Sequence, residues 1–174
     1  MSGKYTIFAP TSHVVACSCY VPDNASEALE RSTAAFRGEV IRLKVESIDG
    51  RNYDVALLSV SEIWKGIEDT QVMVYTNWSS CNFNFEIGEE YLLYPYEHEG
   101  KLKVINCGRS AEVGVAQHDL TELGAGTQPS HEVHLEHEFR KAESIKQLAL
   151  MILVVLLLAA SLNVVRKYYS SPRD

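Results

Sequence analysis

The chain has 174 residues, enough for one ordinary domain with an appended segment. Its formal net charge of −7 disfavours nucleic acid as a partner, because the phosphates would be repelled. The four cysteines form no C-x-x-C pair, which disfavours a zinc site and thioredoxin-type chemistry, so we expect no bound metal and no cofactor. Four cysteines allow three disulfide pairings, and pairing would indicate an extracytoplasmic location.

Residues 1–16 resemble a truncated or miscalled secretory signal. Lys4 would be its basic region, residues 5–9 a short apolar region, and residues 14–16 a cleavage site before Cys17. The alternative interpretation is a plain disordered N-terminus.

Two short helices are expected. Asn24 with Glu27 is close to a capping box and predicts a helix over 25–34. A second helix is predicted over 116–123, where Gly124 stops it.

Five strands are expected between these helices, because apolar and polar residues alternate in segments separated by turn signals. The segments are 36–46, 53–64, 71–76, 90–96 and 102–107. Asp49-Gly50 predicts a tight turn, a slip in the alternation near Ser61 predicts a β-bulge, and Pro95 predicts an edge or bulge. The fold class is therefore mainly β, and a five-stranded Greek-key barrel of the OB-fold type with two short flanking helices fits the pattern.

The C-terminal part has a different composition. Residues 125–146 are predicted to be a polar stalk, 147–165 a transmembrane helix and 166–174 a short basic tail. The uncharged run 148–165 would extend roughly 27 Å as a helix, close to the ~30 Å hydrocarbon core of a bilayer. Basic residues are balanced on its two sides, so the cysteines decide the orientation: a single-pass membrane protein whose N-terminal domain is extracytoplasmic.

Short motifs occur in a fixed order along residues 17–124. They are Cys17-Ser18-Cys19, Phe36-Arg37-Gly38-Glu39-Val40, Tyr53-Asp54-Val55, Trp64-Lys65-Gly66, Ser80-Cys81 and Gly88-Glu89-Glu90-Tyr91-Leu92. In this order, and with Cys107 ending the fifth strand, the chain resembles the netrin-like module of the tissue inhibitors of metalloproteinases.

The resemblance implies two disulfides, Cys17–Cys81 and Cys19–Cys107. It also implies inhibition of a zinc metalloprotease by an inhibitory ridge, which consists of Cys17, Ser18, Cys19, Tyr20, Val21 and Pro22. After cleavage behind Ala16, the α-amine and carbonyl of Cys17 would chelate the zinc of the protease, although the free protein would bind no metal. Ser18 would enter the adjacent specificity pocket, and Cys19, Val21 and Pro22 would line the substrate cleft.

An enzyme is not expected, because the chain has no nucleophile elbow, phosphate-binding glycine loop or nucleophile beside an obvious base. The alternative function belongs to another class: a non-inhibitory extracellular module that binds a protein or a glycan.

Three further patterns have two interpretations each. His131, His134 and His137 would share a face on a helix and could hold a divalent metal, but a solvated stalk is the simpler interpretation. Trp64 with Tyr91, Tyr94 and Tyr96 could stack a ligand, although packing in the core is commoner. Asn24 and Asn77 begin glycosylation sequons, which have meaning only in a eukaryotic secretory pathway.

Overall fold

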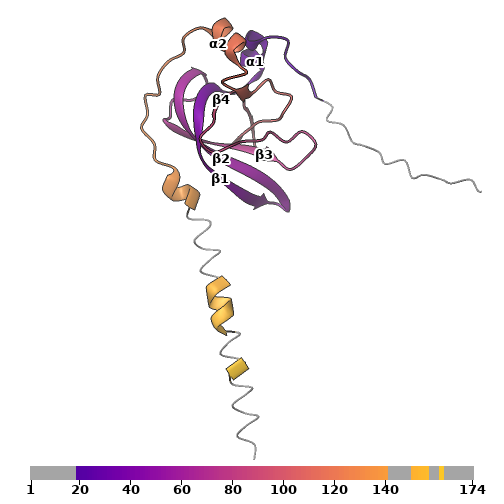
Figure 1. Ribbon diagram of the computed structural model, residues 1–174, viewed down its shortest axis with the longest axis vertical. Coiled ribbons are helices and arrows are strands. Elements are labelled where there is room, and N and C mark those ends of the chain that lie inside the picture. The colour runs from indigo at the N-terminus through magenta and orange to yellow at the C-terminus, as the bar shows by residue number, and fades with distance from the viewer. Residues whose placement is uncertain (1–18, 141–149, 157–160, 163–174) are drawn as a thin grey trace, which may run out of the picture. The chain divides into compact units, whose positions relative to one another are not determined.

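The structure is a computed structural model that describes residues 19–140, 150–156 and 161–162. The chain divides into two compact units, 1–131 and 132–174. The predicted signal segment 1–16 lies outside the described residues. The first unit contains the curved sheet and both short helices (Figure 1).

The first unit is mainly β, as the sequence predicts. Its elements in chain order are α1 (Ala25–Arg31), β1 (Ala35–Ile48), β2 (Arg51–Lys65), β3 (Gln71–Asn77), β4 (Glu90–Leu93), β5 (Tyr96–His98), β6 (Lys101–Lys103), β7 (Ala111–Glu112) and α2 (Gln117–Leu123). Both helices and the first three strands therefore lie where they were expected.

The prediction of five strands is wrong, because the described residues form a sheet of seven. The expected fourth strand is interrupted at Pro95, which has no N–H to donate to a neighbouring strand. Its carbonyl instead accepts hydrogen bonds from the backbone N–H groups of Thr33 (2.9 Å) and Ala34 (3.2 Å). The strand consequently divides into β4 and β5, as an irregularity at Pro95 would require. The seventh strand, β7, has only two residues and gives no alternation signal.

The strand order is β5-β6-β3-β2-β1-β4-β7, and only the β3–β6 pair is parallel. The two long strands β1 and β2 form a hairpin that turns at Asp49 and Gly50, both at positive φ (50° and 75°). The predicted bulge is confirmed: Arg37 pairs with Glu62 and Gly38 with Val60, so Ser61 is the extra residue. Bulges increase strand twist and bend the sheet, which allows a single sheet to enclose a core.

The apolar side chains form two clusters. The larger fills the concave side of the sheet and includes Phe36, Leu58, Val74, Tyr91 and Leu93. The smaller lies between the sheet and the two helices, which are side by side at one end of the sheet (Figure 1); it contains Ala25, Ala28, Ala35, Leu92, Tyr94 and Ala116. Tyr91 and Tyr94 are therefore core residues, and Tyr96 is 39% exposed.

The first residues of the predicted stalk pair with the sheet. Thr127 forms an antiparallel bridge with Ile63, and His131 forms a parallel bridge with Asp69. A Cβ on Gly126 would lie 2.6 Å from the Ile63 carbonyl oxygen, so this close approach needs glycine. The compact unit accordingly continues to His131.

The second unit has helical turns at 136–140, 150–156 and 161–162. No helix within these described segments is long and apolar enough to cross a membrane. The tail 166–174 and much of the span 147–165 lie outside the described residues, so the membrane-spanning helix stays a prediction.

Candidate functional site

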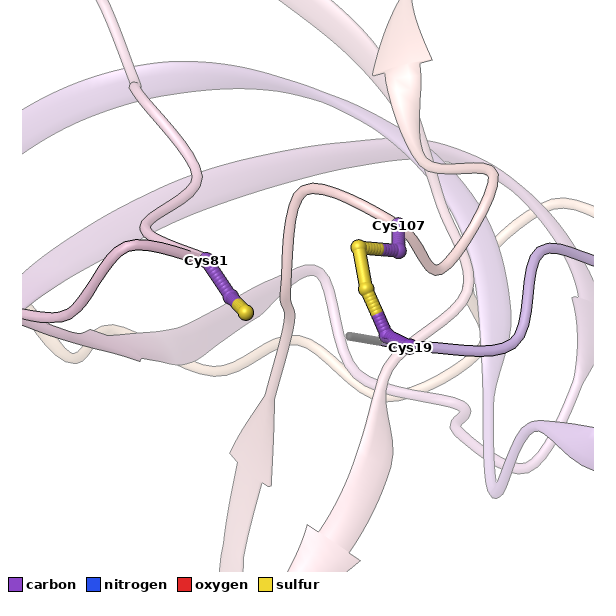
Figure 2. Close-up of side chains that lie close together, drawn as sticks. All are labelled: Cys19, Cys81 and Cys107. Carbon is purple, nitrogen blue, oxygen red and sulfur yellow. A yellow bond between two sulfur atoms is a disulfide. The ribbon is translucent and has the colours of Figure 1, made fainter. Parts of the chain in front are cut away.

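The described part of the predicted ridge is held by a disulfide. Cys19 is bonded to Cys107, 88 positions further along, with their Cα atoms 6.0 Å apart (Figure 2), which confirms this predicted pair. The sulfur of Cys81 lies within 4.8 Å of the other two sulfurs. Cys17 and Ser18 lie outside the described residues, so the Cys17–Cys81 pair stays a prediction.

This group of sulfurs has a spacing that could hold a metal ion. Metals bind cysteine as the thiolate, however, and a sulfur in a disulfide has no thiolate to offer. None of the described cysteines is free. In its oxidised form, the cluster therefore serves as a structural tie.

Tyr20 is fixed on the surface of α1. Its hydroxyl donates to the Glu27 carboxylate (2.5 Å), and the Arg31 guanidinium lies 4.1 Å from the centre of its ring. Glu27 and Arg31 also form an ion pair at 3.1 Å. The hydrogen bond to Glu27 raises the pKa of Tyr20, and the same bond lowers the pKa of Glu27. The ring nevertheless remains open to solvent, because Tyr20 is 55% exposed.

The next two residues differ in accessibility. Val21 is 57% exposed, whereas Pro22 is buried. Behind this segment lies a cavity of about 240 Å³, whose walls include Tyr20, Pro22, Tyr94 and Ile105. Between Cys19 and Pro22, the side chains of Tyr20 and Val21 are therefore accessible from solvent.

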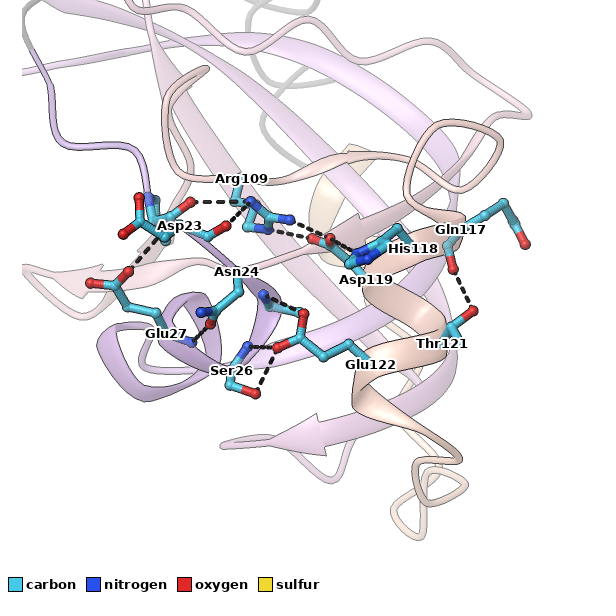
Figure 3. Close-up of polar contacts among 12 residues, drawn as sticks. Asp23, Asn24, Ser26, Glu27, Arg109, Gln117, His118, Asp119, Thr121 and Glu122 are labelled. Atoms are coloured by element: carbon cyan, nitrogen blue, oxygen red, sulfur yellow. Dashed lines mark hydrogen bonds and ion pairs between the residues drawn. The ribbon is translucent and has the colours of Figure 1, made fainter.

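Arg109 is the residue of this site that the sequence did not identify. Its Nη1 donates to the carbonyls of Pro22 (3.1 Å) and Asp23 (3.2 Å), and its Nε and Nη2 donate to both oxygens of Asp119 (2.7 and 2.6 Å) (Figure 3). The Asp119 carboxylate raises the pKa of Arg109. No sequence signal could reveal these contacts, because Arg109 and Pro22 are 87 positions apart.

The ridge continues directly into α1, whose first turn is capped twice. The side chain of Asn24 accepts from the Glu27 N–H (2.8 Å), and Glu27 accepts from the Asp23 N–H (2.9 Å), a variant of the predicted capping box. Glu122 of α2 accepts from the N–H groups of Ala25 (3.2 Å) and Ser26 (2.9 Å). These bonds lower the pKa of Glu122, the bond from the Ser26 N–H most of all.

Trp64-Lys65-Gly66, one of the motifs that carry the resemblance, joins both helices to the sheet. The Trp64 indole N–H donates to the Gly124 carbonyl at the end of α2 (2.9 Å). The Lys65 ammonium donates to the carbonyls of Leu29 (2.8 Å), Glu30 (3.0 Å) and Ser32 (2.6 Å) at the end of α1. The motif thereby fixes the helices that support the ridge.

Two other motifs meet across β1 and β4. Arg37 forms an ion pair with Glu90 (2.6 Å), which also accepts from the Ser61 hydroxyl (3.1 Å). The pair with Arg37 lowers the pKa of Glu90, and Glu90 raises the pKa of Arg37. This ion pair therefore links β1 to β4, and the Ser61 hydroxyl connects the bulge of β2 to the same carboxylate.

A second accessible surface lies along the hairpin of β1 and β2. A groove of about 570 Å³ has walls that combine apolar with charged side chains: Leu43, Lys44, Val45, Asp54, Asn84, Phe85 and Glu86. Beside it, Trp78 is 57% exposed and donates from its indole N–H to Asp54 (2.8 Å).

The three histidines of the predicted stalk do not lie on one helix. His131 forms the bridge with Asp69, and the helix begins only at 136, so both His131 and His134 lie outside it. The imidazole of His131 lies 3.5 Å from Glu68 and 3.7 Å from Asp69, all three well exposed. The helical arrangement in which the three histidines would share a face is therefore not formed over the described residues 131–135.

No protein-family model matches the chain, and no curated protein matches it either.

Proposed function

We propose that this chain is a membrane-anchored, extracytoplasmic domain with an OB-type barrel, similar to the tissue inhibitors of metalloproteinases. The domain would inhibit a zinc metalloendopeptidase through the ridge Cys17–Pro22. Zinc chelation would come from the freed α-amine and the carbonyl of Cys17, with Ser18 in the neighbouring pocket.

The sheet topology supports the barrel. The strands β4 and β5 lie at or next to opposite ends of the sheet order but are consecutive in the chain, separated only by Tyr94 and Pro95. Counted as two halves of one strand, they leave six strands, or five without the two-residue β7, and the order of these five closes on itself. The parallel β3–β6 pair is the crossover that a Greek-key barrel of this kind requires.

One observation carries the inhibitory function. The segment Cys19–Pro22 is bound to the domain at Cys19 and at Pro22, yet Tyr20 and Val21 between these points are exposed. A segment fixed at both ends loses little conformational entropy on binding. A catalytic zinc keeps one coordination position open for water. The amine and the carbonyl of one residue can displace that water and form a chelate ring on the metal.

The exposed helix in the second unit supports the membrane anchor. Residues 150–156 are all apolar and all exposed, with Leu150 62% and Leu156 61% accessible. A continuous apolar surface of this kind indicates contact with lipid or with another protein. The uncharged run 148–165, of which this helix is a part, favours lipid.

The test compares two forms of the protein in detergent. One consists of residues 17–174, with the membrane segment included, and the other has an additional alanine before Cys17. Both are incubated with a matrix-type metalloprotease, and the inhibition constant is measured. We expect inhibition by the first form and a loss of at least about 100-fold in the second, because its amine is replaced by an amide. Equal inhibition by the two forms would exclude chelation.

The groove along the β1–β2 hairpin favours a second candidate, a non-inhibitory module that binds a protein or a glycan. Exposed Trp78 beside the Asp54 carboxylate offers a stacking face and a hydrogen-bond acceptor, a combination suited to sugars. N-terminal sequencing of the mature protein distinguishes the candidates. A chain that begins at Cys17 favours the inhibitor, and one that begins at Met1 or Ser2 favours the binding module.

A further inference from the structure

Helix α2 holds the backbone that leaves the ridge at four points. Asp119, acting through Arg109, holds the carbonyls of Pro22 and Asp23, and Glu122 holds the N–H groups of Ala25 and Ser26 (Figure 3). Asp119 and Glu122 are three positions apart, so they share one face of the helix. Asp119 thus acts on backbone carbonyls through Arg109, whereas Glu122 accepts directly from backbone N–H groups.

Arg109 is suited to this connection by the shape of its guanidinium. The planar group can donate to a carboxylate with one edge and to carbonyl oxygens with the other, which an ammonium cannot do with the same geometry. The Asp119 side chain is 8% exposed and that of Arg109 is 24% exposed, so water screens the contact weakly. Arg109 also has a positive φ of 66°, a backbone conformation uncommon for a residue other than glycine.

The disulfide and Arg109 act on neighbouring points of the same two segments. Cys107 bonds to Cys19, and two residues later Arg109 reaches Pro22. The disulfide limits the distance between the segments but leaves rotation about its own bonds. Two hydrogen bonds from the partly buried Arg109 guanidinium, to the carbonyls of Pro22 and Asp23, restrict that remaining rotation.

We propose that Arg109, braced by Asp119, is a positioning residue that sets the orientation of the ridge residues Cys19–Pro22 toward their partner. The inference rests on the proposed function, because it assigns the ridge as the binding element. Arg109 touches no partner itself. It acts by holding two carbonyl oxygens at the base of the ridge.

The test uses the full chain beginning at Cys17, with Arg109→Lys, Arg109→Gln and Asp119→Asn as variants. Thr121→Ala is the matched control, because among the described residues its hydroxyl donates to the Gln117 carbonyl within α2 (2.8 Å) and has no bond to the ridge. Each variant is measured twice: for inhibition of a matrix-type metalloprotease, and for amide hydrogen exchange along the chain. Mass spectrometry verifies that the disulfides are intact.

We expect inhibition at least about tenfold weaker in both Arg109 variants, since charge-assisted hydrogen bonds are lost, and no change in Thr121→Ala. Amides between Tyr20 and Ser26 should exchange faster, whereas those of β2 should keep their protection. The Arg109→Lys variant is decisive, because it keeps the positive charge but lacks the planar guanidinium. We expect it to show the same weaker inhibition and the same faster exchange at Tyr20–Ser26 as Arg109→Gln.

Two results would overturn the inference. One is wild-type exchange at Tyr20–Ser26 in Arg109→Lys, which would show that the charge alone is sufficient. The other is faster exchange throughout β2 as well, which would show a general role in stability. If the unsubstituted chain inhibits no protease, the proposed function fails, and the exchange pattern still decides whether Arg109 positions the ridge.

Discussion

Gly66 provides a sharp test of how the sheet is joined to α1. Its φ is +79°, and a Cβ at this position would lie 2.1 Å from the Thr33 carbonyl oxygen. Gly50, in the β1–β2 turn, has a similar φ of +75° but no atom within 4 Å of the same position. The two glycines therefore differ in crowding and share the same backbone conformation.

The expected magnitudes follow from this difference. Gly50→Ala should cost about 1 kcal/mol, the penalty for a side chain at positive φ. Gly66→Ala has the same penalty and must also displace the Thr33 carbonyl. The neighbouring N–H groups of Thr33 and Ala34 both donate to Pro95, so the displacement strains two further hydrogen bonds, each worth about 1 kcal/mol. We expect a total of about 3 kcal/mol for Gly66→Ala.

Urea unfolding followed by tryptophan fluorescence measures both free energies of unfolding, and unchanged m values would verify that the unfolded states are comparable. The difference between the two variants is the quantity of interest. If Gly66→Ala and Gly50→Ala lose the same stability within about 0.5 kcal/mol, the close approach at Thr33 is refuted.

Three other predictions concern pH, the disulfide and the membrane. Arg37 lowers the pKa of Glu90 in the folded protein. The stability that this pair contributes is therefore present above the ordinary glutamate pKa of 4.5 and is lost as the pH falls through the lower folded-state pKa. In Glu90→Gln, the free energy of unfolding should depend less on pH in that range. Replacing Cys107 by serine, which opens the loop of 88 positions to Cys19, should cost about 4 kcal/mol in urea unfolding, and an unchanged midpoint would contradict this. The full chain should sediment with membranes after a carbonate wash, and a chain ending before 147–165 should not; equal sedimentation would refute the anchor.

The sequence alone determined the elements whose signals are local. The alternation along β1 and β2 defines both strands, Asp49-Gly50 the turn between them, and the slip at Ser61 the bulge. These succeed because a side-chain period or a required φ is a property of neighbouring residues. The Cys19–Cys107 pair came from the ordered motifs as a whole, through a resemblance, and no single motif specifies it.

Only the tertiary structure decided how the ridge is held. Arg109 carries no motif and becomes important because the Cys19–Cys107 disulfide and the packing of α2 bring it to Pro22 and Asp119. Pro95 predicts an irregularity in the fourth strand from the sequence, but the partners of its carbonyl, the N–H groups that follow α1, were decided by the tertiary structure. The local pattern along a chain determines its strands and helices, whereas contacts between distant segments depend on the packing of the whole domain, which no local pattern records.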